Sequence, residues 1–500
     1  MPVRGVTIGG PTTTRRIPAT SPNVTSVDRQ AVNIEPAVAE LVPAPDAEDV
    51  FRRLASYDRC LFLDSALRDE TLGRYSFVTA NPCAWLEQSA AETGGLDNVV
   101  RWLDRCAGTR VTGLPPFQGG VAGLFGYDFN RQFETLPAAR YDEFGVPALA
   151  VGLYDVVVAF DHRDERCWII SQGWPETDGD RRRRRAEDRL AWIRAIVAGA
   201  CPGGLPSGGP PALTVPASAL APQFATSVQA TLTSDFAPDG YLRAVERAVQ
   251  YICDGDVFQV NLKQRLLRPA ASDSVSLYLR MRRRNPATFA AYLDLGDVQI
   301  VSASPERFLR VDDREVESRP IKGTRRRTHL PEADLFAGDE LKASEKDRAE
   351  NVMIVDLMRN DLSRVCETDS VRVTDLCRLE NYAFVQHLVS GVVGRLAADK
   401  SSFDLLAATF PGGSVTGAPK IRAQEIIAEL EPTARGAYCG SLGYIGLDGA
   451  MDTSILIRTV TAAGGWWQAP VGGGIVAQSV PRHEYEETWH KAEGLLRAFE

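Results

Sequence analysis

The sequence lacks the features that mark two large classes of protein. Its longest apolar stretch, residues 146–160, is too short to span a bilayer and is interrupted by Asp155. It has no surplus of basic residues, since the net charge is -9 and the isoelectric point is near 5.4. A nucleic-acid partner is disfavoured because phosphate binding needs a basic face. We therefore expect no membrane integration and no nucleic-acid binding.

The sequence also lacks paired cysteines and a secretory signal. Its nine cysteines are scattered singly, without a C-x-x-C pair, which favours a reducing compartment. The first 27 residues contain no acidic residue and no apolar run. This composition excludes a secretory signal and fits either an organelle transit peptide or a disordered extension. We favour the extension, and hence a cytoplasmic protein.

The clearest boundary in the chain is a stretch near residue 201 that is rich in Pro, Gly, Ser and Ala and carries no charge over 201–222. After it, residues 239–253 show helical periodicity and 257–266 are predicted as a strand. The sequence thus predicts four parts: an extension (1–45), an N-terminal α+β region (46–200), a linker (201–225) and a C-terminal catalytic region (226–500).

Four carboxylates occur as two pairs at helical spacing. Asp347 lies three residues before Glu350, and Glu484 lies three residues before Glu487. Members of such a pair share one helix face, where like charges repel unless a cation lies between them. Oxygen ligands without histidine or thiolate suit Mg²⁺ better than Zn²⁺. The spacing alone leaves open whether these acids hold a metal or simply face water.

A second candidate is a lysine near a glutamate. Residues 298–320 are predicted as strands separated by Pro305 and by a turn at 312–313, and an antiparallel return places Glu306 near Lys322. Such a pair can act as a nucleophile with its acid/base partner, or form a plain ion pair. Local evidence alone favours the ion pair.

Two glycine-rich segments, residues 412–417 and 472–474, are predicted as turns that offer backbone N–H groups to an anion. Neither matches the Walker pattern or G-x-G-x-x-G, so a nucleotide is not expected. Each segment is equally consistent with a tight structural turn.

Several longer segments resemble the chorismate-utilising enzymes. The resemblance rests on residues 304–308 (Ser-Pro-Glu-Arg-Phe), 320–324 (Pro-Ile-Lys-Gly-Thr), 349–362, 417–420 (Gly-Ala-Pro-Lys), 455–459 (Ile-Leu-Ile-Arg-Thr) and 484–491. Weaker matches at 62–65 and 116–128 extend it over almost everything after residue 45. It implies an α/β (α+β) fold of the anthranilate synthase component I type, in which two β-sheets pack orthogonally with helices outside.

The resemblance also implies roles for individual residues. Glu350 and Glu487 are expected to bind Mg²⁺ with help from Glu484 and Asp347, although several relatives have glutamate at position 347. The expected catalytic side chains are Lys322, Glu306 and His387. The expected substrate contacts are Gly323, Thr324, Ser414, Tyr438, Arg458, Gly472, Gly473, Gly474 and Lys491.

Lys322 distinguishes branches of the family. Anthranilate synthases resemble this chain but carry alanine within Pro-Ile-Ala-Gly-Thr, whereas lysine is associated with the branch that makes 4-amino-4-deoxychorismate for p-aminobenzoate and folate. That chemistry has Lys322 adding at C2 of chorismate, Glu306 acting as general acid, and ammonia entering at C4. The alternatives are an anthranilate synthase large component and a non-catalytic chorismate or tryptophan sensor on the same fold.

Three nearby positions bear on this assignment. Isochorismate and salicylate synthases use a lysine to activate water where this chain has Gln259, which cannot act as a base at neutral pH. Gln478 replaces a common aspartate, and Lys263 replaces a small polar residue in Asn-Leu-x-Gln-Arg. Amination is therefore favoured over hydration.

The ammonia source and an effector follow from the same resemblance. The chain contains no Gly-x-Cys-x-Gly elbow of a glutaminase, so a separate glutamine amidotransferase subunit is expected to form a heterodimer with it. Residues 62–65 resemble the tryptophan-binding segment of the family, which makes Asp64 and Ser65 expected contacts of a bound tryptophan.

Overall fold

A computed structural model describes residues 35–68, 72–106, 108, 110–200, 209–327, 331–381 and 385–500. Most of the predicted extension, and residues 201–208 of the predicted linker, lie outside the described residues. Within the described ranges, no helix has the length and apolar character that a membrane crossing requires.

The described strands form two antiparallel sheets. The larger has 13 strands, in the spatial order β1 (Ala37–Glu40), β8 (Arg166–Ser171), β7 (Val156–Asp161), β3 (Tyr75–Thr79), β2 (Leu61–Asp64), β12 (Phe289–Asp294), β13 (Val298–Ser304), β22 (Thr459–Ala463), β23 (Trp466–Ile475), β11 (Gln259–Pro269), β10 (Thr233–Ser234) and β9 (Phe224–Ala225), with β19 (Gly417–Ala418) paired to β11. The smaller has 10 strands, in the order β16 (Ile321–Arg326), β18 (Val385–Arg395), β15 (Glu315–Ser318), β14 (Arg307–Asp312), β21 (Met451–Ile455), β20 (Ser441–Gly446), β5 (Gly120–Phe125), β6 (Leu149–Tyr154) and β4 (Ala84–Gln88), with β17 (Arg372–Asn381) paired to β18.

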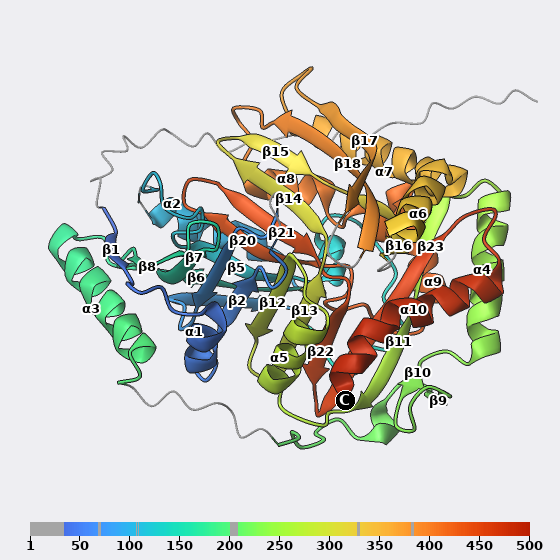
Figure 1. The fold of residues 1–500 in the computed structure, drawn as a ribbon, viewed down its shortest axis with the longest axis horizontal. Helices are drawn as coiled ribbons and strands as arrows, with labels where there is room; N and C mark the ends of the chain where they lie inside the picture. Colours follow the sequence, from blue (N-terminus) through green and yellow to red (C-terminus); the bar gives the residue numbers. More distant parts are fainter. Residues whose placement is uncertain are drawn as a thin grey trace, which may run out of the picture. The chain divides into compact units, whose positions relative to one another are not determined.

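The two sheets share one apolar core, and helices cover their other faces (Figure 1). The shared core contains Phe77 and Ile300 from the larger sheet and Leu124 and Leu442 from the smaller one. The described helices are α1 (Ala47–Leu54), α2 (Gly95–Arg105), α3 (Gly179–Val197), α4 (Pro238–Cys253), α5 (Ser274–Arg284), α6 (Pro331–Ala343), α7 (Glu345–Ser363), α8 (Ser402–Thr409), α9 (Lys420–Leu430) and α10 (Pro481–Phe499), with 3-10 turns η1 (Tyr127–Gln132), η2 (Ala217–Ala219) and η3 (Gly413–Val415). The predicted fold class is confirmed.

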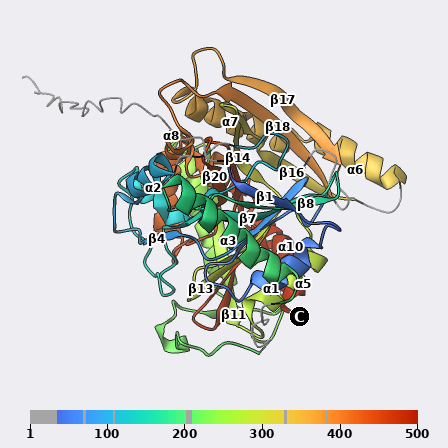
Figure 2. The same ribbon diagram turned by 90° about the vertical axis from the view of Figure 1, so that its left-hand side faces the viewer.

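Helices α1, α3, α5 and α10 bury their apolar sides in a cluster on the larger sheet, while α2, α7 and α8 do so on the smaller one. Helix α7 lies along β16 and β18, as the turned view shows (Figure 2). Helix α10 packs on β23. These two helices contain the predicted acid pairs, so the two pairs lie on helices that pack on different sheets.

Both sheets contain strands from before and after residues 201–225. In the larger sheet β2 pairs with β12, so that Phe62 lies opposite Tyr292. In the smaller sheet β5 pairs with β20, with Leu124 opposite Leu442. Folding of either sheet therefore needs residues far apart in the sequence.

A buried ion pair joins these distant regions. Arg265 on β11 donates to both carboxylate oxygens of Glu143, at 2.7 and 3.1 Å. The two side chains are only 2% and 5% exposed. Glu143 also accepts from the backbone N–H of Ala221 at 2.8 Å, which fixes the predicted linker to the same point. A charge left here without its partner would be costly, because burial removes the side chain from water.

We expect Glu143→Met to lower the free energy of unfolding by about 3–5 kcal/mol, since it leaves the Arg265 guanidinium buried without its carboxylate. Urea unfolding measures the loss. Glu40→Met is the matched control, because the Glu40–Arg166 pair lies at the surface, with side chains 36% and 50% exposed. Equal losses in the two variants would show that the Glu143–Arg265 pair carries no special weight.

Candidate active site

Lys322 lies on β16 at a point where the strand bulges. The register of β16 against β18 shifts between Lys322 and Thr324, and the intervening Gly323 has φ of 78°. That conformation favours glycine, and such a bulge re-aims the neighbouring side chain. A Cβ at position 323 would lie 3.1 Å from the Asp347 Cγ. Glycine at this position therefore lets β16 and α7 approach closely.

Glu306 immediately precedes β14 and lies near Lys322, as the predicted hairpin requires. Ser414 of η3 connects the two: its hydroxyl donates to Glu306 Oε1 at 2.9 Å, and its carbonyl accepts from Lys322 Nζ at 2.9 Å. Burial raises the pKa of Glu306 to about 7. Lys322 and the Ser414 hydroxyl act in the opposite direction, as does the more weakly coupled Arg458. A carboxyl group with this pKa can donate a proton near neutral pH.

His387 and Arg458 complete this group. Burial, together with the positive charge of Arg458, lowers the pKa of His387 to about 4, so the imidazole is neutral at pH 7. His387 also shares a hydrogen bond with the backbone of Gly323. Arg458 has φ of 50°, an unfavourable conformation for a residue with a side chain, of a kind often found at functional sites. Burial lowers the pKa of Arg458, and the Glu306 carboxylate acts in the opposite direction.

The predicted acids of α7 and α10 also interact with Lys322. Burial raises the pKa of Glu350; the cations Lys322 and Lys346 oppose this, and the negative charges of Asp347 and Glu487 add to it. Burial also acts on Glu487, but there the cations Lys491, Lys346 and Lys322 together outweigh it and the pKa is lowered. The two helices therefore bring their acids close enough to influence one another.

Lysines neutralise part of this negative charge. Lys346 Nζ lies 3.3 Å from Glu484 Oε1, and Lys491 Nζ lies 2.7 Å from Glu487 Oε1. Burial disfavours the Lys346 ammonium, but Glu484 and Glu350 outweigh it and raise its pKa. Asp347 lies 3.8 Å from Arg325.

The chemistry of these donors fits Mg²⁺. Two carboxylates from each of two helices provide the hard oxygen ligands that Mg²⁺ prefers. Glu350, whose charge is opposed by burial and by two neighbouring acids, would gain from a cation. In the described part of the chain, however, no three His, Cys, Asp or Glu side chains are grouped as a ready metal site. Lys346 and Lys491 hold Glu484 and Glu487 instead.

The prediction that residues 472–474 form a turn is wrong. They lie inside β23, where Gly472, Gly473 and Gly474 pair with Lys263, Leu262 and Asn261 of β11. The glycines are needed for space: a Cβ on Gly472 would lie 2.4 Å from the Leu262 carbonyl oxygen, and one on Gly474 would lie 2.0 Å from Gln259 Nε2. A Cβ on Gly473 would instead face Lys491, Glu487 and Glu484 at 3.4–3.6 Å. Gly473 therefore forms the floor below the α10 acids, and Lys491 donates to the carbonyl of Gly472 at 2.9 Å.

One predicted side chain lies outside the described residues, and two others lie in a separate cluster. The side chain of Thr324 is outside the described residues. Tyr438 is buried against Arg435 and Cys439. Asp64 and Ser65 form a separate cluster on the larger sheet, in which Asp64 accepts from Tyr278 at 2.8 Å and from Arg282 at 2.7 Å. Ser65 donates to the Tyr75 carbonyl at 2.6 Å.

The structure adds two residues that the sequence did not single out. Lys346 bonds Glu484, and the Ser479 hydroxyl donates to the same oxygen at 2.6 Å. A signal for Lys346 was available, because it stands four residues before Glu350 on one helix face. Ser479 lies in the loop before α10 and offered no such pattern.

Comparison with known proteins gives a consistent result. Residues 59–497 match the family described as chorismate binding enzyme. The chain is 44% identical to anthranilate synthase component 1 of Thermus thermophilus, over 77% of this chain and 79% of that protein. It is 38% identical to aminodeoxychorismate synthase component 1 of Escherichia coli, over 93% and 99% respectively. The crystal structure of anthranilate synthase component I from Streptococcus pneumoniae superimposes with a TM-score of 0.72 at 30% identity, covering 86% of this chain and 93% of that one.

We expect Glu306→Gln to change how stability depends on pH. The folded carboxyl has a pKa of about 7, well above its ordinary value of 4.5, so the parent loses stability as pH rises between these values. Glutamine cannot ionise, so the variant should gain on the parent by up to about 3 kcal/mol between pH 4.5 and 8. Urea unfolding at pH 5 and pH 8 measures the difference.

Glu315→Gln is the control, since the Glu315 side chain is 58% exposed on β15 and forms only a surface pair with Arg395. If Glu306→Gln and the parent changed in parallel across this pH range, Glu306 would not be a carboxyl group that stays protonated near neutrality.

Proposed function

This chain belongs to the family of chorismate binding enzymes, and we propose that it is the large component of an aminodeoxychorismate synthase. It is an enzyme of the aminodeoxychorismate synthase and anthranilate synthase component I type. Within that type, the proposed reaction converts chorismate and ammonia to 4-amino-4-deoxychorismate and water, an amino-group transfer that feeds p-aminobenzoate and folate synthesis.

The observation that carries this proposal is a lysine next to a carboxyl group of raised pKa. Ser414 contacts both Lys322 and Glu306, which keeps the amine and the acid in one small site. An amine can attack the substrate while a carboxyl group that is protonated near pH 7 gives a proton to the leaving group. Anthranilate chemistry needs no nucleophile from the protein, since ammonia attacks C2 directly.

The proposed reaction has two steps. Lys322 Nζ forms a bond to C2 of chorismate, the C4–O bond breaks, and Glu306 donates the proton that lets the hydroxyl leave as water. Ammonia then forms a bond to C4, the bond from C2 to Lys322 breaks, and the surplus proton returns to Glu306. His387 stays neutral, so it can donate or accept a hydrogen bond without adding charge.

Cations in the site suit a substrate with two carboxylates. The Arg458 guanidinium lies close enough to Glu306 for their charges to interact, and we propose that it binds one carboxylate of chorismate. Lys491 lies over Gly472 and Gly473, where it can contact the other. Mg²⁺ held by Glu350 and Glu487, with Glu484 and Asp347 assisting, would neutralise a substrate carboxylate and draw electrons from the ring.

An anthranilate synthase large component is the second candidate, because the Thermus thermophilus relative of that name shares 44% identity with the chain. Lys322 is the residue that decides between the two. Ammonia is proposed to come from a separate glutamine amidotransferase subunit. A tryptophan bound near Asp64 and Ser65 is a further proposal. In the structure these two side chains form hydrogen bonds with Tyr278 and with the Tyr75 carbonyl.

Lys322→Ala should abolish formation of 4-amino-4-deoxychorismate, with a loss of at least about 100-fold, because no amine remains to attack C2. Any residual product should be anthranilate. The assay supplies chorismate, Mg²⁺ and ammonium, followed by a lyase that converts aminodeoxychorismate to p-aminobenzoate. Lys342→Ala controls for loss of a surface lysine, since the Lys342 side chain is 55% exposed on α6. Fluorescent anthranilate as the main product of the parent enzyme would refute the assignment.

Mg²⁺ should stabilise the parent protein against heat, because a ligand that binds only the folded state shifts the unfolding equilibrium. At saturating Mg²⁺ we expect about 1–3 kcal/mol. Glu350→Gln and Glu487→Gln should lose this stabilisation. Glu486→Gln should keep it, because Glu486 points away on the same helix and pairs with Arg482 at 2.7 Å. Equal Mg²⁺ responses in all three variants would place the metal elsewhere.

A further inference from the structure

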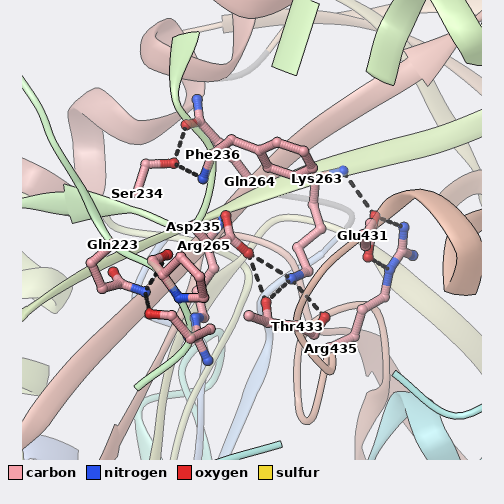
Figure 3. Close-up of polar contacts among 12 residues, drawn as sticks. Gln223, Ser234, Asp235, Phe236, Lys263, Gln264, Arg265, Glu431, Thr433 and Arg435 are labelled. Atoms are coloured by element: carbon pink, nitrogen blue, oxygen red, sulfur yellow. Dashed lines mark hydrogen bonds and ion pairs between the residues drawn. The ribbon is translucent and has the colours of Figure 1, made fainter. Parts of the chain in front are cut away.

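Lys263 is a buried cation that the proposed reaction does not use. It lies on β11 opposite Gly472, and its side chain is fully buried. Its ammonium donates to the Thr433 hydroxyl at 2.6 Å and to the Thr433 carbonyl at 3.0 Å. Asp235 lies 3.5 Å away and also accepts from the Thr433 hydroxyl, at 2.7 Å (Figure 3). The ammonium therefore holds the turn formed by residues 431–435.

The backbone of Lys263 also forms a hydrogen bond to this turn. Its N–H donates to Glu431 Oε1 at 2.9 Å, and Glu431 in turn binds Arg435 through two hydrogen bonds of 2.7 and 2.9 Å (Figure 3). The Glu431 and Arg435 side chains are 2% and 1% exposed. Lys263 thus fixes both the start of the turn and its middle, and Arg435 stands at its end.

Arg435 connects this turn to the active site through hydrogen bonds. It donates to the Val415 carbonyl at 2.9 Å and to the Asn261 carbonyl at 3.0 Å. Val415 follows Ser414, the residue whose hydroxyl and carbonyl contact Glu306 and Lys322. A displacement of Arg435 would therefore move the short η3 segment to which the acid and the amine are both bonded.

We propose that Lys263 is a positioning residue for the proposed amination: by holding the 431–435 turn it sets Arg435, and through Arg435 it keeps Ser414 against Glu306 and Lys322. The proposal rests on the proposed function for its catalytic consequence, but not for its structural one.

The charges around the cluster explain why one residue matters. Lys263 pairs with Asp235, Arg265 with Glu143 and Arg435 with Glu431. Burial lowers the pKa of Lys263, and the carboxylates of Asp235 and Glu431 favour its charged form. Removing the Lys263 ammonium leaves Asp235 without its ion-pair partner and the Thr433 carbonyl without its donor. Both changes act on the turn.

The test compares Lys263→Met with the double variant Lys263→Met/Asp235→Asn. The single variant should lose stability, because it leaves a buried charge unpaired. The double variant removes the ion pair as a unit and should regain most of that stability, while the Thr433 carbonyl still lacks its donor. Ser234→Ala is the control: Ser234 is buried nearby and donates to Gln264 at 2.8 Å, but it makes no bond to the turn.

The first readout is the pKa of Glu306 and needs no catalysis. In the parent, in both Lys263 variants and in Ser234→Ala, the effect of Glu306→Gln on the free energy of unfolding is measured as a function of pH. The pH at which this effect changes gives the pKa of Glu306 in each protein. The Ser414 hydroxyl lowers the pKa of Glu306, so loosening it should raise that pKa by about 0.5–1 in both Lys263 variants and not in Ser234→Ala. Lys322 and Arg458, the other charges that face Glu306, are unchanged in all of them.

The second readout is ammonia-dependent turnover. In both Lys263 variants we expect kcat to fall about tenfold, KM for chorismate to stay within about twofold, and the alkaline limb of the profile to move to higher pH. Normal kcat and an unchanged Glu306 pKa in the double variant would overturn the proposal and leave Lys263 with a role in stability alone. A parent enzyme that makes no aminodeoxychorismate would refute the proposed function, while the first readout would still decide the role of Lys263.

Discussion

An ionisable side chain that folding removes from water needs an opposite charge, a hydrogen bond or a changed protonation state. This constraint organises the interior of the protein. Glu143 and Arg265 meet this requirement by forming a buried ion pair, and Glu431 and Arg435 form a second one. Glu306 meets the requirement by a change of protonation state. Its partners do not fully offset the effect of burial, and its pKa rises to about 7. The buried ion pairs are structural, whereas Glu306, whose burial is incompletely compensated, is suited to proton transfer.

The same constraint accounts for the division of the site into two parts. One part contains Glu306 and Arg458, whose charges interact. The other contains the acids of α7 and α10, with Lys346 and Lys491 as their ion-pair partners. Under the proposed function, a substrate carboxylate would bind in the first part and Mg²⁺ would bind in the second.

Much of the fold followed from local pattern. The helix expected at 239–253 is α4, Pro238–Cys253, and the strand expected from residue 257 is β11, Gln259–Pro269. The turn at 312–313 joins β14 to β15 as an antiparallel hairpin. The turn expected at 472–474 is a strand instead, because these glycines let neighbouring strands and α10 approach closely. The pairing of β2 with β12 could not be read from either segment, since register between distant strands depends on the packing of the whole core.

The chemical groups of the site could be named from sequence patterns: the acid pairs, because helical spacing puts them on one face, and Lys322, because its motif resembles that of one branch of the family. The behaviour of those groups depends on the tertiary structure. It placed Ser414 between Glu306 and Lys322, and it buried Glu306 deeply enough to hold a proton near neutral pH. It also connected Lys263 to that site through a turn more than 160 residues away in the chain. Burial and distance between side chains arise from long-range packing, and a linear pattern contains neither quantity.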